Sequence, residues 1–281
     1  MADSPPEDLR YEVVDHVATV TFARPDKLNA FRARTMSEFL AVLDEIDTDD
    51  DVRAVVVTGE GRAFCAGADI SGGAAAFEPA APKEGLGTPP RDGGGLLALR
   101  IHELKKPIIA AVNGASIGMG ATMTLPMDVR LAASTARFGF VFTRRGIIPE
   151  GCSSWFLPRV VGIGTASEWM LTGRVVDAAE ARAAGLVQAV HAPAELLSAA
   201  YALAREISDN AAPVSAAMTR QLLARMLGAT DPMDAHLAES RGLAVRSRSE
   251  DAREGVAAFL EKRTAQFPQR VSADYVDMFG D

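Results

Sequence analysis

The chain has 281 residues, of which 48% are hydrophobic, 23% are charged and only 6% are aromatic, so we expect a globular protein with a core of small and aliphatic side chains. Its net charge of −8 argues against broad binding to nucleic acid or anionic membranes, because both need a positive field. The two cysteines lack metal-like spacing, and neither a secretory signal nor a membrane-helix window is present, so we expect a soluble cytoplasmic protein without a metal site.

The first third of the chain predicts two strands, a helix and a third strand. Phe39, Leu43 and Ile46 recur at helical spacing, which is typical of an amphipathic helix. The predicted elements are a flexible start at 1–10, a hairpin of 11–14 and 17–22, a polar turn at 24–30, a helix over 32–48 and a buried strand over 52–58.

The third strand leads through a Gly59-Glu60-Gly61 turn to the small-residue stretch Ala63–Ile70. Small residues let the backbone approach a ligand closely. We therefore expect this loop to donate a backbone N–H to a negative charge that develops during a reaction. The rest of the chain must then supply a second donor, a proton-transfer group and a way to hold the substrate.

A second alternation of strands and helices follows and favours an α/β core. Strands are predicted over 107–112, 128–132 and 186–190. The helix before the last strand has Asp177 as its N-cap, Glu180 in a capping-box pattern and Gly185 as its stop.

Residues 71–95 contain seven glycines and four prolines and predict a long surface excursion with a short helix near 74–77. We interpret it as a lid or substrate-side wall, with a tolerated insertion as the alternative. After about residue 194 only helices are predicted, over 194–208, 213–227, 232–246 and 250–265, with Ser249 as the N-cap of the last.

Another Gly-rich stretch, Asn113–Thr122, follows the strand over 107–112. Its glycine spacing does not match the dinucleotide-binding fingerprint, and no Gly-Lys-Ser/Thr follows for a P-loop. A strand-to-helix turn of small residues can direct backbone N–H groups at an anion, although close packing alone also explains such a turn. Two such turns, each at the end of an apolar strand, favour the functional interpretation.

Four stretches in order resemble the crotonase superfamily, the enoyl-CoA hydratase/isomerase group, and the resemblance as a whole extends over about residues 11–267. They are Ala66-Gly67-Ala68-Asp69-Ile70, Lys106–Gly114, Phe138-Gly139 with Gly146-Ile147-Ile148-Pro149, and Ala258–Arg263. The resemblance implies an α/β fold in which a crotonase-like spiral of repeated ββα units (11–195) precedes a helical C-terminal trimerisation domain (196–281). It also implies a homotrimer or a dimer of trimers.

The resemblance further implies chemistry on an acyl-CoA thioester, whose enolate is held by two backbone N–H groups. The matching donors are Ala68 and Met119, the latter where glycine is usual. Coenzyme A is then part of the substrate, and no separate cofactor is expected. The implied substrate-binding residues are Lys27, Leu28, Ala30, Ala66, Asp69, Ile70, Gly118 and Phe142, with Phe259 and Lys262 reaching the adenosine phosphates from a neighbouring subunit.

The sequence departs from the hydratase pattern at both positions where the resemblance implies a glutamate, which are Thr122 and Phe142. Neither side chain can transfer a proton to or from water, so two-carboxylate hydration is not expected. Glu150 matches the catalytic glutamate of Δ3,Δ2-enoyl-CoA isomerases, which need only one base. The alternative is an ordinary glutamate at a helix start after Pro149.

Three functions follow in order of preference. The first is a Δ3,Δ2-enoyl-CoA isomerase with Glu150 as its base. The second is another crotonase reaction, such as slow hydration, a lyase step or thioester hydrolysis. The third is an acyl-CoA binder without catalysis.

Overall fold

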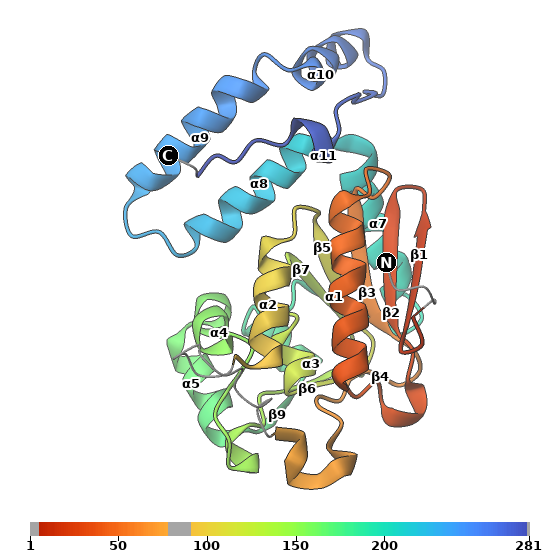
Figure 1. Ribbon diagram of the computed structural model, residues 1–281, viewed down its shortest axis with the longest axis vertical. Coiled ribbons are helices and arrows are strands. Elements are labelled where there is room, and N and C mark those ends of the chain that lie inside the picture. Colours follow the sequence, from red (N-terminus) through yellow and green to blue (C-terminus); the bar gives the residue numbers. More distant parts are fainter. Residues whose placement is uncertain (1–5, 78–90, 280–281) are drawn as a thin grey trace, which may run out of the picture.

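The protein is described by a computed structural model that covers residues 6–77 and 91–279. A mixed α/β body carries the N-terminal strands and most of the helices, and helices α8 to α10 extend over one end of it (Figure 1). Within the described part of the chain, no helix is long and apolar enough to cross a membrane. The two cysteines, Cys65 and Cys152, are free thiols.

The body contains a six-stranded sheet in the order β1-β2-β3-β5-β7-β10. Only the predicted hairpin, β1 with β2, pairs antiparallel, and the remaining neighbours are parallel. The central strands are buried on both faces, which explains their continuous apolar runs. The strands are β1 (Leu9–Val14), β2 (Val17–Phe22), β3 (Ala54–Gly59), β5 (Ile108–Val112), β7 (Val129–Ala133) and β10 (Ala189–His191).

A second sheet of four strands has the order β4-β6-β8-β9. Each strand has three residues: β4 (Ala63–Cys65), β6 (Ala115–Ile117), β8 (Arg137–Gly139) and β9 (Val175–Asp177). Strands β3 and β4, β5 and β6, and β7 and β8 follow one another in pairs, so each passage of the chain adds one strand to each sheet. This recurrence agrees with the spiral of ββα units implied by the sequence.

Helices cover both faces of the large sheet. Inward side chains of α7 (Leu196–Asn210), including Leu196 and Ala200, pack on Val56 and Ile109. The opposite face forms the main core with α1 (Ala33–Thr48) and α2 (Gly93–Glu103). There Phe22 makes edge-to-face contacts with Phe31, Phe39 and Phe64 at centroid distances of 5.3–5.5 Å. Helix α7 therefore belongs to the α/β body, and the C-terminal helices that do not pack on the large sheet begin with α8.

The other helices include the C-terminal ones predicted from the sequence. They are α3 (Met119–Thr122), α4 (Ser153–Val161), α5 (Ile163–Thr172), α6 (Ala178–Ala183), α8 (Pro213–Met226), α9 (Pro232–Arg246), α10 (Glu250–Glu261) and α11 (Val271–Asp274), with 3-10 turns η1 (Pro25–Lys27), η2 (Ile70–Phe77) and η3 (Thr143–Arg145). The predicted N-caps are confirmed: Asp177 accepts a hydrogen bond from Glu180 N, and Ser249 from Ala252 N.

Some predicted boundaries were wrong. Residues 93–95 were assigned to the surface excursion but form the first turn of α2, because Asp92 caps that helix by accepting a hydrogen bond from Gly95 N. Residues 78–90 of the predicted excursion lie outside the described residues. Helix α10 ends at Glu261 rather than at residue 265, since Lys262 adopts a left-handed conformation with φ 56°.

Candidate active site

The two small-residue loops meet at one edge of the second sheet. Strands β4 and β6 pair in parallel, so the loops that follow them leave the sheet at the same edge. Gly67 has φ +96°, and a Cβ there would lie 2.8 Å from the carbonyl oxygen of Ile117. A Cβ on Gly120 would lie 2.1 Å from the carbonyl oxygen of Cys65. The loops are therefore in backbone-to-backbone contact, which only glycine allows at these positions.

The N–H of Ala68 is turned away from its neighbouring strand. Ala68 forms a parallel bridge with Phe31, and the bridge uses the groups on either side of it: Phe31 N donates to Gly67 O, and Asp69 N donates to Phe31 O. In a parallel bridge of this kind, the N–H of the central residue points to the opposite side. Within residues 6–77 and 91–279, this N–H has no protein acceptor, so it is free to bind a substrate oxygen.

The N–H of Met119 is similarly available at the start of α3. Gly118 takes the left-handed φ of 55° that turns the chain into this helix, and its own N–H donates to Gly139 O. Met119 does not have a positive φ, so the side chain causes no backbone strain at a position where glycine is usual. Among the described residues, Met119 N also lacks a carbonyl partner. Two unpaired N–H groups on touching loops can stabilise an oxyanion.

Glu150 approaches this pair through Thr122. The Thr122 hydroxyl donates to Glu150 Oε1 over 2.6 Å, and it lies 3.3 Å from the carbonyl oxygen of Met119. Helix α4 begins only at Ser153, and the Glu150 carboxylate is directed to α3 rather than to the start of α4. The alternative interpretation of Glu150 as a helix-start residue therefore does not describe its side chain.

The surroundings of Glu150 favour its neutral form. Burial raises the pKa of its carboxyl to about 7, the hydrogen bond from Thr122 opposes this rise, and the negative charge of Asp92 adds to it. A carboxyl group with a pKa near neutrality exchanges protons readily at physiological pH. Asp92 was not singled out in the sequence, although an aspartate directly before a predicted helix start is a recognisable N-cap signal.

The segment Lys27–Phe31 lies against the Ala68 loop. Ala66 N donates to Leu28 O over 3.0 Å. Asn29 is buried and adopts a left-handed conformation, and its side-chain amide donates to Ala63 O. Lys27 is exposed at the end of η1, where it can meet a phosphate.

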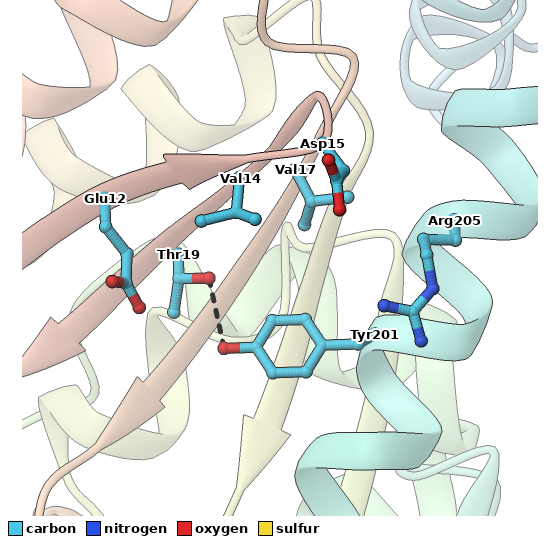
Figure 2. A pocket seen from close by; sticks show the side chains of 7 residues that line it. All are labelled: Glu12, Val14, Asp15, Val17, Thr19, Tyr201 and Arg205. Atoms are coloured by element: carbon cyan, nitrogen blue, oxygen red, sulfur yellow. Dashed lines mark hydrogen bonds between the residues drawn. The ribbon is translucent and has the colours of Figure 1, made fainter.

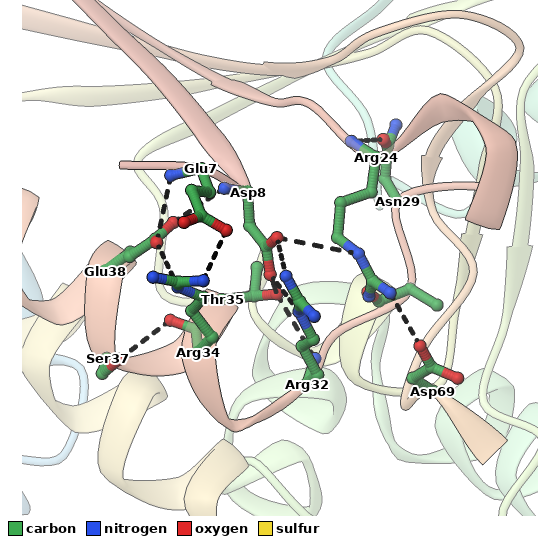
Figure 3. Close-up of polar contacts among 11 residues, drawn as sticks. Glu7, Asp8, Arg24, Asn29, Arg32, Arg34, Thr35, Ser37, Glu38 and Asp69 are labelled. Carbon is green, nitrogen blue, oxygen red and sulfur yellow. Dashed lines mark hydrogen bonds and ion pairs between the residues drawn. The ribbon is translucent and has the colours of Figure 1, made fainter. Parts of the chain in front are cut away.

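Arg24 joins this segment to the Ala68 loop, although nothing in the sequence distinguished it from the rest of the polar turn. Its guanidinium donates to Ala30 O over 2.5 Å. It also donates to Asp69 Oδ2 over 2.9 Å (Figure 3). Hydrogen bonds from Ser71 and from Arg24 lower the pKa of Asp69 to about 2. Asp69 is therefore ionised at neutral pH, and the ion pair fixes the loop that carries Ala68.

Three of the remaining predicted residues differ widely in exposure. Ile70 is exposed, whereas Phe142 is 5% exposed and belongs to the main core. Phe259 is 81% exposed on α10, which lies at the end of the molecule that is far from α3 (Figure 1). A contact between Phe259 or Lys262 and the same chain's site is therefore not formed, and their predicted role requires another subunit.

A hollow of about 210 Å³ lies elsewhere, between the hairpin and α7 (Figure 2). Thr19 and Tyr201 share a hydrogen bond of 3.2 Å in it, and Glu12, Asp15 and Arg205 supply its charges. None of the residues assigned to the reaction lines it. No group of three or more potential metal ligands occurs in the described part of the chain.

The chain is similar to known proteins over most of its length. The family profile described as enoyl-CoA hydratase/isomerase matches residues 12–270. Enoyl-CoA hydratase ACTT3 of Alternaria alternata is 40% identical over 254 residues, which cover 90% of this chain and 83% of that protein. The 1,2-epoxyphenylacetyl-CoA isomerase of Escherichia coli is 34% identical over 252 residues, covering 89% and 94% of the two chains.

Solved structures show the same fold. The crystal structure of an enoyl-CoA hydratase from Bacillus anthracis superposes with a TM-score of 0.83 at 29% identity, and the match covers 93% of this chain and 99% of that one. Together with the family profile over residues 12–270, this similarity establishes the fold and the enzyme family. The chain belongs to the enoyl-CoA hydratase/isomerase family, within the crotonase superfamily.

Proposed function

We propose that this enzyme is a Δ3,Δ2-enoyl-CoA isomerase in which Glu150 is the only proton carrier. The observation that supports this most strongly is the position of the Glu150 carboxylate, which is hydrogen-bonded to Thr122 on the helix that begins with Met119. The two positions where the resemblance implies hydratase glutamates hold Thr122 and Phe142. A site with one carboxylate suits a reaction that only relocates a proton.

The proposed reaction proceeds in two proton transfers. The Glu150 carboxylate removes a proton from C2 of a 3-enoyl thioester, and the electrons move into a dienolate whose oxygen accepts hydrogen bonds from Ala68 N and Met119 N. The protonated Glu150 then gives the same proton to C4, and the double bond ends between C2 and C3. The fixed backbone dipoles stabilise charge that is greatest in the intermediate, which lowers the barrier to both transfers.

The raised pKa of Glu150 suits both halves of this cycle. A base with a pKa of about 7 is ionised in a large fraction of molecules at neutral pH, and its conjugate acid is strong enough to return the proton. Burial is the main cause of the raised pKa, and it also keeps water from the intermediate. No separate cofactor or metal is needed in this scheme, because coenzyme A is part of the substrate.

We place the coenzyme A moiety along the Lys27–Ala30 segment, with Ala66, Asp69, Ile70 and Gly118 beside the thioester. This proposal rests on the contact between Leu28 O and Ala66 N, which brings the two segments together. Phe259 and Lys262 would complete the adenosine-phosphate site from a second subunit of a homotrimer or a dimer of trimers. Phe259 is exposed on α10 and Lys262 is exposed directly after it, so both are available for such a contact.

A Glu150→Gln variant tests the proposed base. Glutamine keeps the shape and can accept the hydrogen bond from Thr122, but it cannot take a proton. We expect the variant to bind a 3-enoyl-CoA and to isomerise it at least about 1,000-fold more slowly, at the middle of the range for acid–base catalysis. Glu12→Gln, which removes an exposed carboxylate on β1, is the control. Full activity of Glu150→Gln would refute the assignment.

Hydration of a 2-enoyl-CoA is the second candidate, because several relatives are named enoyl-CoA hydratases, one of them 40% identical to this chain. Glu150 would then take a proton from water, the water oxygen would bond to C3, and the protonated Glu150 would give its proton to C2 of the resulting enolate. The two candidates are separated by product analysis on 2-enoyl and 3-enoyl substrates. Rapid formation of 3-hydroxyacyl-CoA would favour hydration, whereas binding without turnover of either substrate would favour a non-catalytic acyl-CoA protein.

A further inference from the structure

We propose that Gly94 is a positioning residue, whose missing side chain leaves the space in which the Glu150 carboxylate sits; as a statement about catalysis, this rests on the function proposed above. Gly94 is buried in the first turn of α2. A Cβ built on it would lie 1.3 Å from Glu150 Oε2, 2.5 Å from Cδ and 3.2 Å from Oε1. The carboxylate therefore rests directly on the backbone of α2, and any side chain at position 94 would displace it.

The other oxygen of the carboxylate, Oε1, is held by Thr122. Its hydroxyl donates to Oε1 over 2.6 Å, while Oε2 is the atom closest to the space above Gly94. The chain around Glu150 is tied to the same helix, because Gly151 N donates to Asp92 Oδ1 over 3.4 Å. Helix α2 and helix α3 thus hold the carboxylate between them.

Backbone conformation does not explain a glycine at position 94. Gly94 has no positive φ, unlike nine other glycines in the described chain, so alanine could adopt its conformation. Alanine is also strongly favoured over glycine within helices. The neighbouring Gly93 is exposed, and a Cβ there would meet only the flexible end of Met36 at 3.3 Å. Of these two glycines, only Gly94 faces Glu150, and only there would a Cβ collide with the carboxylate.

The main test compares Gly94→Ala with Gly93→Ala, two changes of the same size in the same helical turn. We expect Gly94→Ala to lower kcat on the order of 100-fold, the effect of moving a catalytic group by about an ångström, with little change in KM. The displaced carboxylate would be more solvated, so the acidic limb of the pH profile should move to lower pH. Gly93→Ala should keep both the rate and the pH profile of the wild type.

Stability measurements separate this inference from the proposed function. In a Glu150→Ala background, a Cβ at position 94 meets no carboxylate, so Gly94→Ala should raise the melting temperature. In the wild-type background, the same change should raise the melting temperature less, or lower it, because the Cβ collides with Glu150. This comparison does not depend on activity. If Gly94→Ala changed the melting temperature equally in both backgrounds, the inference would be wrong. If the stability coupling were present but Glu150→Gln remained fully active, only the proposed function would fail.

Discussion

Thr122 donates a hydrogen bond of 2.6 Å to Glu150, and it does so from one of the two positions where the resemblance to hydratases implies a glutamate. A hydroxyl there changes the site in two ways. It removes a charge that would repel Glu150, and it supplies a donor that stabilises the ionised base. Glu150 therefore transfers the protons, and Thr122 adjusts the pKa of Glu150.

Replacing Thr122 by valine keeps the shape of the side chain and removes the donor. Since this hydrogen bond lowers the pKa of Glu150, its loss should raise that pKa further and move the acidic limb of kcat/KM to higher pH. A hydrogen bond to a charged group is worth about one pKa unit, so we expect about a tenfold loss of kcat/KM at pH 6, where less of Glu150 would be ionised. Thr122→Ser, which keeps the hydroxyl, should retain the wild-type profile. An unshifted limb in Thr122→Val would contradict the role given to Thr122.

Asp92→Asn should have the opposite effect on the pH profile. The negative charge of Asp92 raises the pKa of Glu150, so removing it should move the acidic limb of kcat/KM to lower pH. Asparagine is an equally good N-cap, and α2 should keep its first turn. Melting curves check that α2 is intact. A limb that moved to higher pH, as in Thr122→Val, would show that Asp92 acts on Glu150 through structure rather than through charge.

Glu150 is also expected to cost stability at alkaline pH. Its pKa rises from 4.5 to about 7 on folding, so the folded state binds more protons than the unfolded state between these values. The favourable contribution is complete below pH 4.5 and is lost as the pH rises through 7. At pH 8, Glu150→Gln should therefore unfold at a higher urea concentration than the wild type, and its free energy of unfolding should be about 3 kcal/mol larger. The difference should shrink at pH 5.5, and a constant difference would contradict a buried, titrating carboxyl.

The sequence predicted the elements whose patterns are long enough to detect. The helix over 32–48 and the strand over 52–58 correspond to α1 and β3, since each repeats its apolar spacing over several residues. The three-residue strands β4 and β6 were not predicted, because three residues cannot establish an alternation. Yet these two strands bring Ala68 and Met119 to the same edge, and only the resemblance indicated that relationship.

The surroundings of Glu150 could not be predicted for a different reason. Gly94 is one of three consecutive glycines, and nothing in Gly93-Gly94-Gly95 distinguishes the middle one. Its contact with Glu150 depends on the packing of α2 beside α3, which is a property of the fold. The role of Arg24 could not be predicted for a similar reason. Its partners are the backbone oxygen of Ala30 and the carboxylate of Asp69, which lie on two separate loops that only the fold brings together.

Arg24 offers a test of how strongly the Ala68 loop depends on its support. Both Arg24 and Asp69 are about 15% exposed, so their ion pair is well shielded from solvent. Arg24→Met keeps the apolar stem but frees Asp69 and Ala30, and we expect about a tenfold loss of kcat as the loop loosens. Arg10→Met is the matched control, since the Arg10–Glu60 pair is exposed and should contribute little. Equal activity of the two variants would show that the loop holds its conformation without Arg24.

Arg220 should anchor the C-terminal helices to the body. From α8 its guanidinium pairs with Asp128 at 2.8 Å and donates to the carbonyl oxygens of Ile101 and Leu104 at the end of α2, with only 4% of the side chain exposed. Arg220→Met should lower the free energy of unfolding by about 3 kcal/mol, because it leaves these acceptors unpaired. Arg225→Met, on the same helix but 44% exposed, should cost less than about 1 kcal/mol in the same urea titration. Equal costs for the two variants would mean that the buried contacts of Arg220 do not hold α8 to the end of α2.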